Sequence, residues 1–510
     1  MGFDPAGLTI PLQDTSPQLA STMATDIPKY DSIIIGSGQA GMPLSITLAR
    51  ARRKTVLIER EHIGGCCINE GCTPTKTLVA TGRIAYLTRR CQRYGVHMCS
   101  SLSSQASAEN DVIIDMARVR QRRRDIVTSF RDNDARRMAS AGVEILMGEA
   151  SFVDSHTLKV RMTADGSERL VQGQTIFINT GARPAPPPLS GLETVDQRRI
   201  LDSTAVQELD AVPQHLAVIG GGYVGVEFAQ FFHRLGARVT LIQRNTQVLP
   251  QEDPEIADVL QQILREDGMT VYLDASTRSV APSSESPDKI DIAVRFKNGD
   301  TTTVTGCTHI LYASGRVPNT DRLNLGAAGV ETDKKGYIVI NDFLQTSAPH
   351  IYALGDVKGA PAFTHIAYDD FRIIRANLVA PAARLIRLST KDRVVPYVVY
   401  TDPQLAHVGL HEQEAREMFP DKRIMTARMP ISYVERALET DEPRGLMKAV
   451  VDGETGLILG FSCVATEGGE LMSLVEMAMI GAIPYRKMQD AVWAHPTWAE
   501  SLNMLWMYLQ

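Results

Sequence analysis

Residues 31–41 have the sequence Asp-Ser-Ile-Ile-Ile-Gly-Ser-Gly-Gln-Ala-Gly, in which an apolar run leads directly into a glycine-rich turn. The apolar run at 32–35 predicts a buried strand, and the pattern that follows predicts a helix over 42–51. A second apolar run predicts another strand at 55–58. Together these segments predict a strand–helix–strand unit of the kind that binds dinucleotides.

The glycines of this turn have the spacing Gly36-x-Gly38-x-x-Gly41, and Glu59 follows 21 residues after Gly38. In such a unit the glycines let the backbone turn and approach a pyrophosphate, which rests on the helix N-terminus. The carboxylate at the end of the second strand receives the ribose hydroxyls of an adenosine. Such a glycine motif alone is weak, but strand, helix and acid in register predict a dinucleotide site.

The same pattern of strand, glycine turn, helix and strand recurs in residues 215–243, where Gly220-x-Gly222-x-x-Gly225 follows an apolar strand at 216–219. This is the internal repeat of the chain, and it predicts a second dinucleotide-binding domain of the doubly wound type.

The residue that corresponds to Glu59 in the second unit is Gln243, and Arg244 follows it. Loss of the acid removes repulsion against a 2′-phosphate, and an arginine can pair with that phosphate. The second site is therefore expected to prefer NADP(H). The alternative is an NAD site with an incidental surface arginine.

Residues 64–76 have the sequence Gly-Gly-Cys-Cys-Ile-Asn-Glu-Gly-Cys-Thr-Pro-Thr-Lys, with four residues between Cys67 and Cys72. Two nearby thiols are often merely buried, and a zinc site would need a second ligand pair with suitable spacing. A redox disulfide is the third interpretation, because the start of a helix and Lys76 both favour thiolate. Such a pair holds two electrons, which a flavin or nicotinamide can supply.

His495 and Glu500 lie five residues apart near the end of the sequence. A histidine tuned by a carboxylate is an efficient proton shuttle near neutral pH. The spacing alone is a weak signal, and an ordinary surface histidine is the first interpretation of it.

Composition excludes several classes of protein. The 510 residues are enough for about three domains, and no apolar stretch is long enough to span a membrane. The net charge is -6, and the basic cluster at 118–124 falls in a helical pattern typical of a solvated face, so no nucleic-acid partner is expected. Seven cysteines argue against a secreted disulfide framework. No metal site is expected.

The first 28 residues contain no Lys or Arg, which fits neither a secretory signal nor a mitochondrial transit peptide. They are predicted to be a flexible leader of a cytoplasmic protein. The expected fold class is α/β, with two doubly wound dinucleotide-binding domains and a C-terminal α+β dimerisation domain. The expected boundaries are 29–183 with 310–384 for the first, discontinuous domain, 184–309 for the second and 385–510 for the third.

The order of these motifs resembles that of the pyridine nucleotide–disulfide oxidoreductases, flavoproteins that include dihydrolipoamide dehydrogenase, glutathione reductase and mercuric reductase. The resemblance covers nearly all of residues 29–510 and includes the redox segment at 64–76. The segments at 180–184 and 314–319, which contain Gly181 and Gly315, are similar to the two motifs of the family in which the chain crosses between domains. Residues 352–356 are similar to its flavin-contacting segment, and residues 401–403 and 495–500 to segments of its interface domain.

The resemblance implies that the first glycine site holds FAD and the second NADP(H). It implies that Cys72 faces the flavin and that Cys67 attacks the substrate, with Lys76 paired to Glu227 beside the flavin. Asp356 would hold the ribityl chain, and Tyr223 would gate the nicotinamide pocket. His495, oriented by Glu500, would serve the active site of the other subunit, which makes a homodimer part of the mechanism.

Several residues depart from the patterns of named relatives. Ile46 stands where glutathione-type reductases have a substrate-binding Arg, and residues 506–510 lack the C-terminal cysteine pair of mercuric reductases. Gln243 departs from the acid of NAD-dependent dihydrolipoamide dehydrogenase. Cys66 replaces the usual Thr and could exchange with its neighbour or bind a soft metal ion, while Glu70 is expected to disfavour thiolate in the redox loop.

The sequence thus predicts an NADPH-dependent FAD flavoprotein that reduces a small disulfide-type substrate through Cys67 and Cys72. One alternative keeps the flavin and makes a metal ion, such as copper or mercury, or a quinone the acceptor. The other is a flavin-bound partner or sensor protein without turnover, against which the intact set of catalytic residues argues.

Overall fold

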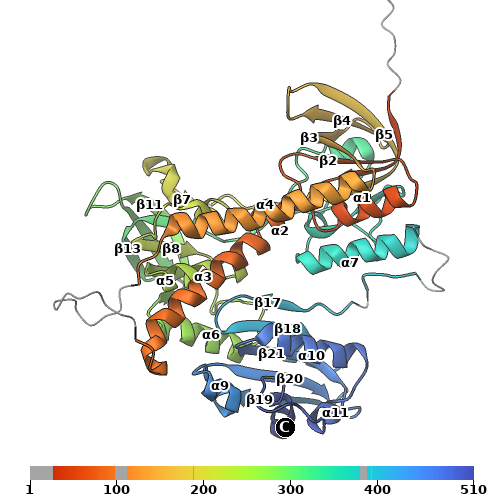
Figure 1. Ribbon diagram of the computed structural model, residues 1–510. Helices are drawn as coiled ribbons and strands as arrows, with labels where there is room; N and C mark the ends of the chain where they lie inside the picture. The colour runs from red at the N-terminus through yellow and green to blue at the C-terminus, as the bar shows by residue number, and fades with distance from the viewer. Residues whose placement is uncertain (1–26, 98–111, 188, 380–386, 392) are drawn as a thin grey trace, which may run out of the picture.

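The computed structural model describes residues 27–97, 112–187, 189–379, 387–391 and 393–510, so the predicted leader lies almost wholly outside the described residues. The chain is a mixed α/β protein, as expected. Figure 1 shows three groups of strands, with the long helix α4 (Met116–Ser140) spanning the first two and α3 (Cys72–Arg90) running beside the second. Within the described ranges, no helix is both long and apolar enough to cross a membrane.

The first sheet is built around β1 (Lys29–Ile35), which pairs in parallel with β2 (Thr55–Glu59) and β5 (Glu168–Ile178). Ile33 and Ile34 of β1 are fully buried, which explains the uninterrupted apolar run. α1 (Gly41–Arg50) makes the crossover between β1 and β2. The remaining strands of this sheet are β3 (Glu144–Phe152), β4 (Thr157–Met162) and β16 (Ile351–Ala353).

The second sheet is parallel and repeats the same unit. Its strands, in spatial order, are β10 (Thr270–Tyr272), β9 (Arg238–Ile242), β8 (His215–Ile219), β14 (His309–Tyr312) and β7 (Ile200–Leu201). A three-stranded antiparallel sheet accompanies it, formed by β11 (Ala275–Pro282), β12 (Ile290–Phe296) and β13 (Thr301–Cys307).

The expected boundary at residue 310 cuts through β14, which pairs in parallel with β8 along its whole length. The return of the chain to the first domain therefore begins after Tyr312. The division into domains stays a prediction, in which the boundary between the second domain and the returning part of the first is now placed after Tyr312.

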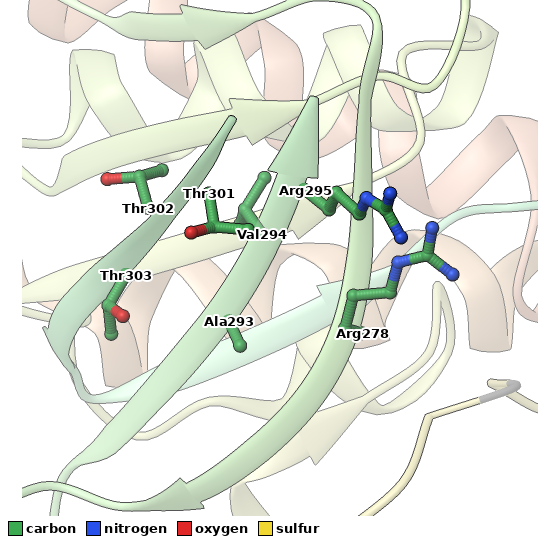
Figure 2. A pocket seen from close by; sticks show the side chains of 7 residues that line it. All are labelled: Arg278, Ala293, Val294, Arg295, Thr301, Thr302 and Thr303. Atoms are coloured by element: carbon green, nitrogen blue, oxygen red, sulfur yellow. The ribbon is translucent and has the colours of Figure 1, made fainter. Parts of the chain in front are cut away.

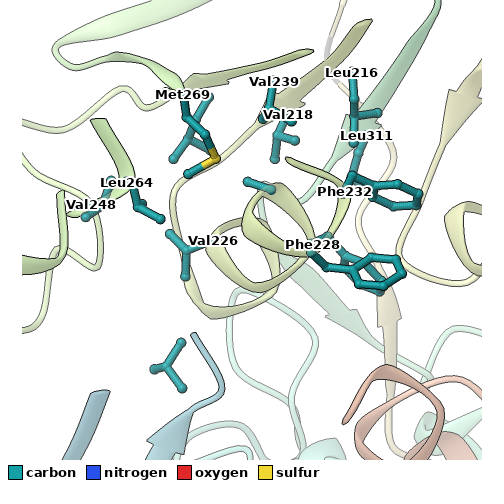
Figure 3. Close-up of a cluster of buried hydrophobic side chains, with 14 of the residues drawn as sticks. Leu216, Val218, Val226, Phe228, Phe232, Val239, Val248, Leu264, Met269 and Leu311 are labelled. Carbon is teal, nitrogen blue, oxygen red and sulfur yellow. The ribbon is translucent and has the colours of Figure 1, made fainter. Parts of the chain in front are cut away.

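The helix α5 (Tyr223–Arg234) brings the core of the second unit together. Its Phe228 and Phe232 are buried against Leu216 and Leu311 of the sheet, as Figure 3 shows. Because one face of α5 packs on this sheet and another on α3, the second unit is fixed directly to the helix that carries Cys72.

The third unit is an antiparallel sheet covered by helices, as expected for an α+β end. α10 (Gly468–Ile480) packs against the sheet, with Leu471 and Val475 buried. The strands, in spatial order, are β17 (Tyr397–Val399), β18 (Gln404–Gly409), β21 (Ile458–Ala465), β20 (Leu446–Asp452) and β19 (Ile424–Pro430). The other helices are α8 (Glu412–Met418), α9 (Glu435–Glu439), α11 (Tyr485–Gln489) and α12 (Ser501–Leu505).

The basic cluster at 118–124 lies on α4, but it is not simply a solvated face. Arg123 is buried and pairs with Glu208 of the second unit, and Arg124 pairs with the same carboxylate at 2.5 Å. Arg120 pairs with Asp210 at 2.6 Å. The cluster therefore attaches α4 to the second unit.

Candidate active site

A cavity of about 910 Å³ is lined by residues from both glycine loops, the redox segment and the third unit. A separate hollow of about 690 Å³ lies on the β11–β13 sheet, where Arg278 and Arg295 extend side by side (Figure 2). The two cavities share no lining residue. The larger cavity is the candidate active site, because many of the residues predicted from the sequence line it, namely Gly36, Gly38, Glu59, Cys67, Cys72, Lys76, Gly181, Tyr223, Glu227 and Asp356.

The first glycine loop is closed against the end of β5. A Cβ atom on Gly36, which has φ +100°, would lie 2.3 Å from the carbonyl oxygen of Asn179. A Cβ atom on Gly41 would lie 2.1 Å from the carbonyl oxygen of Gly36. The buried Asn179 side chain accepts a hydrogen bond from the Gly41 amide at 2.9 Å and donates one to the Leu354 carbonyl at 2.8 Å. These contacts leave the loop backbone open for a close ligand, as a pyrophosphate requires.

Two carboxylates, those of Glu59 and Asp356, line the cavity. Glu59 accepts hydrogen bonds from the amide and the hydroxyl of Ser37, at 2.9 and 2.7 Å. Asp356 lies in the short 3₁₀ helix that follows β16, and burial raises its pKa while Arg316 opposes that shift. The glycine cradle and these acceptors fit the dinucleotide predicted for this site.

The two cysteines of the predicted redox pair lie on consecutive helices. Cys67 is in α2 (Gly65–Asn69), and Cys72 is the first residue of α3. A hydrogen bond from Cys67 lowers the pKa of Cys72 to about 6, the charge of Lys76 helps, and burial opposes it. The same hydrogen bond and burial raise the pKa of Cys67. The Cys72 sulfur also lies 3.3 Å from the Thr364 hydroxyl. These contacts favour a thiolate on Cys72 and a thiol on Cys67 when the pair is reduced.

The predicted pair of Lys76 and Glu227 forms an ion pair of 2.7 Å. The other Glu227 oxygen accepts a hydrogen bond from the Tyr400 amide at 2.7 Å, and the Lys76 ammonium lies 5.0 Å from the centre of the Tyr400 ring. Glu227 is buried, so the negative charge that balances Lys76 is fixed in place.

Cys66 opens onto the same cavity. Arg316 donates a hydrogen bond to its sulfur at 3.5 Å. Burial raises the pKa of the Cys66 thiol, Arg316 opposes the shift, and Glu70 adds to it. Glu70 itself accepts a hydrogen bond from Thr204 at 3.3 Å, so its carboxylate is directed toward the second unit. The expected suppression of thiolate by Glu70 therefore falls on Cys66.

The second glycine loop leads into α5, whose first two residues, Tyr223 and Val224, line the cavity. Gly220 has φ +109°, and a Cβ atom on Gly225 would lie 1.9 Å from the Gly220 carbonyl oxygen. Tyr223, the first residue of α5, lines the cavity and packs on the rings of Phe363 and Tyr397, at centroid distances of 6.0 and 5.5 Å.

Gln243 and Arg244 follow β9 at the position expected for coenzyme selection. Gln243 is buried and accepts a hydrogen bond from the Arg244 amide at 2.9 Å. The Arg244 side chain is exposed. The end of β9 therefore carries the uncharged amide of Gln243 and the exposed guanidinium of Arg244.

His495 and Glu500 form the predicted dyad, with His495 Nδ1 3.0 Å from a Glu500 oxygen. Glu500 raises the pKa of His495 through this hydrogen bond and its charge. The imidazole is exposed and does not line the cavity, so within one chain the dyad stands apart from Cys67.

Sequence reasoning missed three residues of this site. Asn179 orders the glycine loop, Thr364 contacts Cys72, and Arg316 contacts Cys66. Asn179 directly precedes the motif at 180–184, and Arg316 lies within the motif at 314–319. Their proximity to these motifs could have indicated both residues. The strands β6 (Ala182–Pro184) and β15 (Arg316–Pro318) in those motifs pair with each other, so both motifs lie beside the cavity.

Comparison with protein families matches residues 30–370 to the pyridine nucleotide-disulphide oxidoreductase family and residues 395–505 to its dimerisation domain. The chain is 35% identical over 481 residues to the probable pyridine nucleotide-disulfide oxidoreductase RclA of Escherichia coli, covering 94% of this chain and 98% of the relative. It is 35% identical to a mercuric reductase of Lysinibacillus sphaericus, covering 93% and 82%. It is 29% identical to the dihydrolipoyl dehydrogenase of Bacillus subtilis, covering 92% and 96%.

Among solved structures, the chain is similar to the HOCl-induced flavoprotein disulfide reductase RclA of Escherichia coli. Its Cu(II) complex superposes with a TM-score of 0.81 at 33% identity and covers 94% of this chain and 99% of the other. The RclA structure described without copper gives a TM-score of 0.80 at 34% identity.

The electrostatics of Cys72 predict the effect of removing Lys76. In Lys76→Met the pKa of Cys72 should rise, because a cation that favours the thiolate is lost. Thiolate absorbance of the reduced protein, followed as pH falls through about 6, should disappear at higher pH in the variant than in wild type. Lys159→Met, at an exposed lysine of β4, is the control and should leave the titration unchanged. An unchanged titration in Lys76→Met would contradict this assignment of the thiolate.

Proposed function

The chain is a member of the pyridine nucleotide-disulphide oxidoreductase family, and from this premise we propose that it is an NADPH-dependent flavoprotein that reduces a disulfide-type substrate. The family match covers most of the chain, and the chain is accordingly an oxidoreductase of a family that depends on FAD and a pyridine nucleotide. The observation that carries the proposal is the position of Cys67 and Cys72 in a cavity that the first glycine loop and Tyr223 also line, where the contacts of Cys72 lower its pKa to about 6.

The first glycine loop, Glu59 and Asp356 would hold FAD, and the second loop would hold the nicotinamide coenzyme. The chemistry that a bound FAD would supply is two-electron transfer between the nicotinamide and the cysteine pair. Lys76, paired with Glu227, holds a positive charge near Cys72 and so stabilises the thiolate.

The reduced cysteines then exchange with the substrate. Cys67, once deprotonated, attacks one substrate sulfur, forms a mixed disulfide and releases the first substrate thiol. Cys72 attacks the Cys67 sulfur, which restores the intramolecular disulfide and releases the second substrate thiol. Two electrons leave the cysteine pair, and the two thiol products take up two protons.

Cys67 needs a base, because its pKa is raised. The proposed base is His495 of a second copy of the chain, since the dyad with Glu500 lies outside the cavity of its own chain. Exposed apolar side chains on and after α10 support a homodimer through the third unit, namely Leu474, Met477, Ile480, Ile483 and Val492.

Preference for NADP(H) is supported by the pair at the end of β9. Gln243 carries no charge that would repel a 2′-phosphate, and the exposed Arg244 is placed to pair with one.

A second candidate function is reduction of a metal ion at the same cavity. It is favoured by Cys66, whose sulfur opens onto the cavity beside Cys67 and adds a third soft donor. Relatives include mercuric reductases and a protein whose structure was solved as a Cu(II) complex. A metal ion would then be the substrate that receives the electrons.

The disulfide route is tested by Cys67→Ser. Turnover of NADPH with small disulfides should fall more than about a thousandfold, because the attacking sulfur is lost. In anaerobic titration the wild type should take up about four electrons per flavin and the variant about two, since the cysteine pair holds the others. Full disulfide turnover in Cys67→Ser would exclude the disulfide route.

The same assay with Cu(II) or Hg(II) as acceptor tests the second candidate. Cys66→Ser is the matched variant, because it removes the neighbouring sulfur and leaves the redox pair intact. Loss of metal-ion turnover with retained disulfide turnover would assign Cys66 to a metal substrate. Equal metal-ion turnover in Cys66→Ser and wild type would remove the local support for this candidate.

The shared active site predicts complementation between two inactive variants. His495→Gln and Cys67→Ser should each be nearly inactive, but a mixed dimer has one site with native Cys67 and a native His495 from the other chain. Dissociation and random reassociation of the mixture should restore about a quarter of wild-type disulfide turnover. Each variant carried alone through the same procedure is the control, and a mixture that stays inactive would contradict a base supplied by the second chain.

Coenzyme preference is tested by Arg244→Ala. The kcat/KM for NADPH should fall about 10- to 100-fold while that for NADH changes little, because a charge-assisted contact to the 2′-phosphate is lost. Arg278→Ala, an exposed arginine on the β11–β13 sheet, is the control and should change neither value. Equal losses for both coenzymes would contradict the role of Arg244.

A further inference from the structure

Behind Tyr223, where the second and third units meet, lies a buried polar cluster that the sequence did not reveal. Glu252 comes from the segment before α6 (Pro254–Glu266), His407 from β18 and His411 from the start of α8. Glu252 and His407 are 4% and 2% exposed. Such groups are costly to bury, so the contacts they make need an explanation.

The cluster is connected to the cavity through Tyr397 of β17. The Tyr397 hydroxyl donates a hydrogen bond to Glu252 Oε1 at 2.8 Å, and His411 Nε2 lies 3.4 Å from that hydroxyl. The rings of Tyr223 and Tyr397 pack together, and their hydroxyl groups interact. A continuous series of contacts therefore leads from the Tyr223 ring to a buried carboxyl group.

The arrangement does not favour a metal centre at this cluster. Both ring nitrogens of His407 are already hydrogen-bonded, to Ser462 Oγ at 2.8 Å and to the Gly409 carbonyl at 3.0 Å. The rings of His407 and His411 are stacked, with centroids 3.9 Å apart and planes within 17°. Stacked rings of this kind direct their nitrogens in parallel rather than toward one ion, so the cluster is better explained as a support for Tyr397.

We propose that Tyr397 and Glu252 are positioning residues that hold the Tyr223 ring closed over the nicotinamide pocket. This inference rests on the proposed function, under which Tyr223 is the gate of that pocket. A gate held closed lowers the fraction of protein that is competent to bind and weakens nucleotide affinity by the same factor. It also shields the flavin from dissolved oxygen when no nucleotide is bound.

The strength of this hold depends on the charge of Glu252. Burial raises the pKa of Glu252 to about 7, while His411 and the Tyr397 hydroxyl oppose the shift. Ionised Glu252 accepts a stronger hydrogen bond from Tyr397 than the protonated form does. The hold should therefore weaken as pH falls through about 7.

Other titratable and charged groups surround Glu252. Those near it are Tyr223, Tyr397, His407, His411, Glu414 and Asp253. Asp253 in turn pairs with the buried Lys448, which also contacts Glu255 and Glu412, and Glu412 pairs with Arg428.

Tyr397→Phe tests the proposal, because it removes the hydroxyl and keeps the ring that packs on Tyr223. The dissociation constant for NADP⁺, and for NAD⁺ in parallel, measured by calorimetry on the FAD-loaded protein, should decrease about two- to tenfold. Reduced flavin should also react faster with oxygen, passing two electrons and two protons to give hydrogen peroxide. Tyr272→Phe, in β10, is the matched control and should change neither quantity.

Glu252→Gln gives a second, independent test, because the amide keeps an acceptor for Tyr397 but cannot ionise. In wild type the nucleotide should bind more tightly at about pH 6 than at about pH 8, beyond any change seen with Tyr272→Phe. In Glu252→Gln this pH dependence should be absent, and affinity at both pH values should match that of the wild type at the lower pH.

Weaker or unchanged nucleotide binding in Tyr397→Phe, or a pH profile retained in Glu252→Gln, would overturn the proposal. Tyr223→Ala separates this failure from that of the proposed function. If Tyr223→Ala alters neither nucleotide binding nor oxygen reactivity, Tyr223 is not the gate and the assignment beneath the inference is wrong. If Tyr223→Ala alters both while the other two variants behave as wild type, only the inference fails.

Discussion

The ion pair between Lys76 and Glu227 joins all three units of the protein at one point. Lys76 lies on α3 of the first unit, Glu227 on α5 of the second, and the Tyr400 amide that donates to Glu227 belongs to the third. Lys76 is also one helical turn after Cys72 and supports its thiolate. The assembly of the units and the redox chemistry of the cysteines therefore depend on the same charge.

A buried ion pair contributes less to stability than to arrangement, because the cost of removing both charges from water offsets their attraction. The rest of α3 is held in the same manner. Arg83 pairs with Asp402 at 2.7 Å and with Glu442 at 2.9 Å, and both acids belong to the third unit. These directional contacts fix the rotation and height of α3, so Cys72 stays at one position in the cavity. The apolar packing of α5 stabilises the contact between α3 and the second unit, and the ion pairs determine the position of α3 relative to the third unit.

The fold and much of the site could be predicted from the sequence because they depend on local backbone requirements. Gly36 and Gly220 both have positive φ, and the carbonyl groups packed against them leave no room for a Cβ atom. Such constraints appear as glycine spacing in any chain that meets them. The predicted boundary near residue 310 falls inside a strand for a related reason. The strand β14 belongs to the second sheet through pairing with β8, which no local pattern in the sequence records.

What the sequence could not give are the contacts between segments far apart in the chain. Glu70 is next to the redox cysteines in sequence, yet its carboxylate faces Thr204 and its charge acts on Cys66. Thr364 is almost three hundred residues away from Cys72 and touches its sulfur. The sequence therefore did not show that the charge of Glu70 acts on Cys66 or that Thr364 contacts Cys72. The asymmetry of the cysteine pair shows this, because Cys67, Lys76 and the distant Thr364 favour a thiolate on Cys72, whereas the hydrogen bond with Cys72 and burial raise the pKa of Cys67. Attack by Cys67 therefore requires a proton acceptor, and the exposed pair of His495 and Glu500, which does not line the cavity of its own chain, is the reason for proposing that a second chain supplies one.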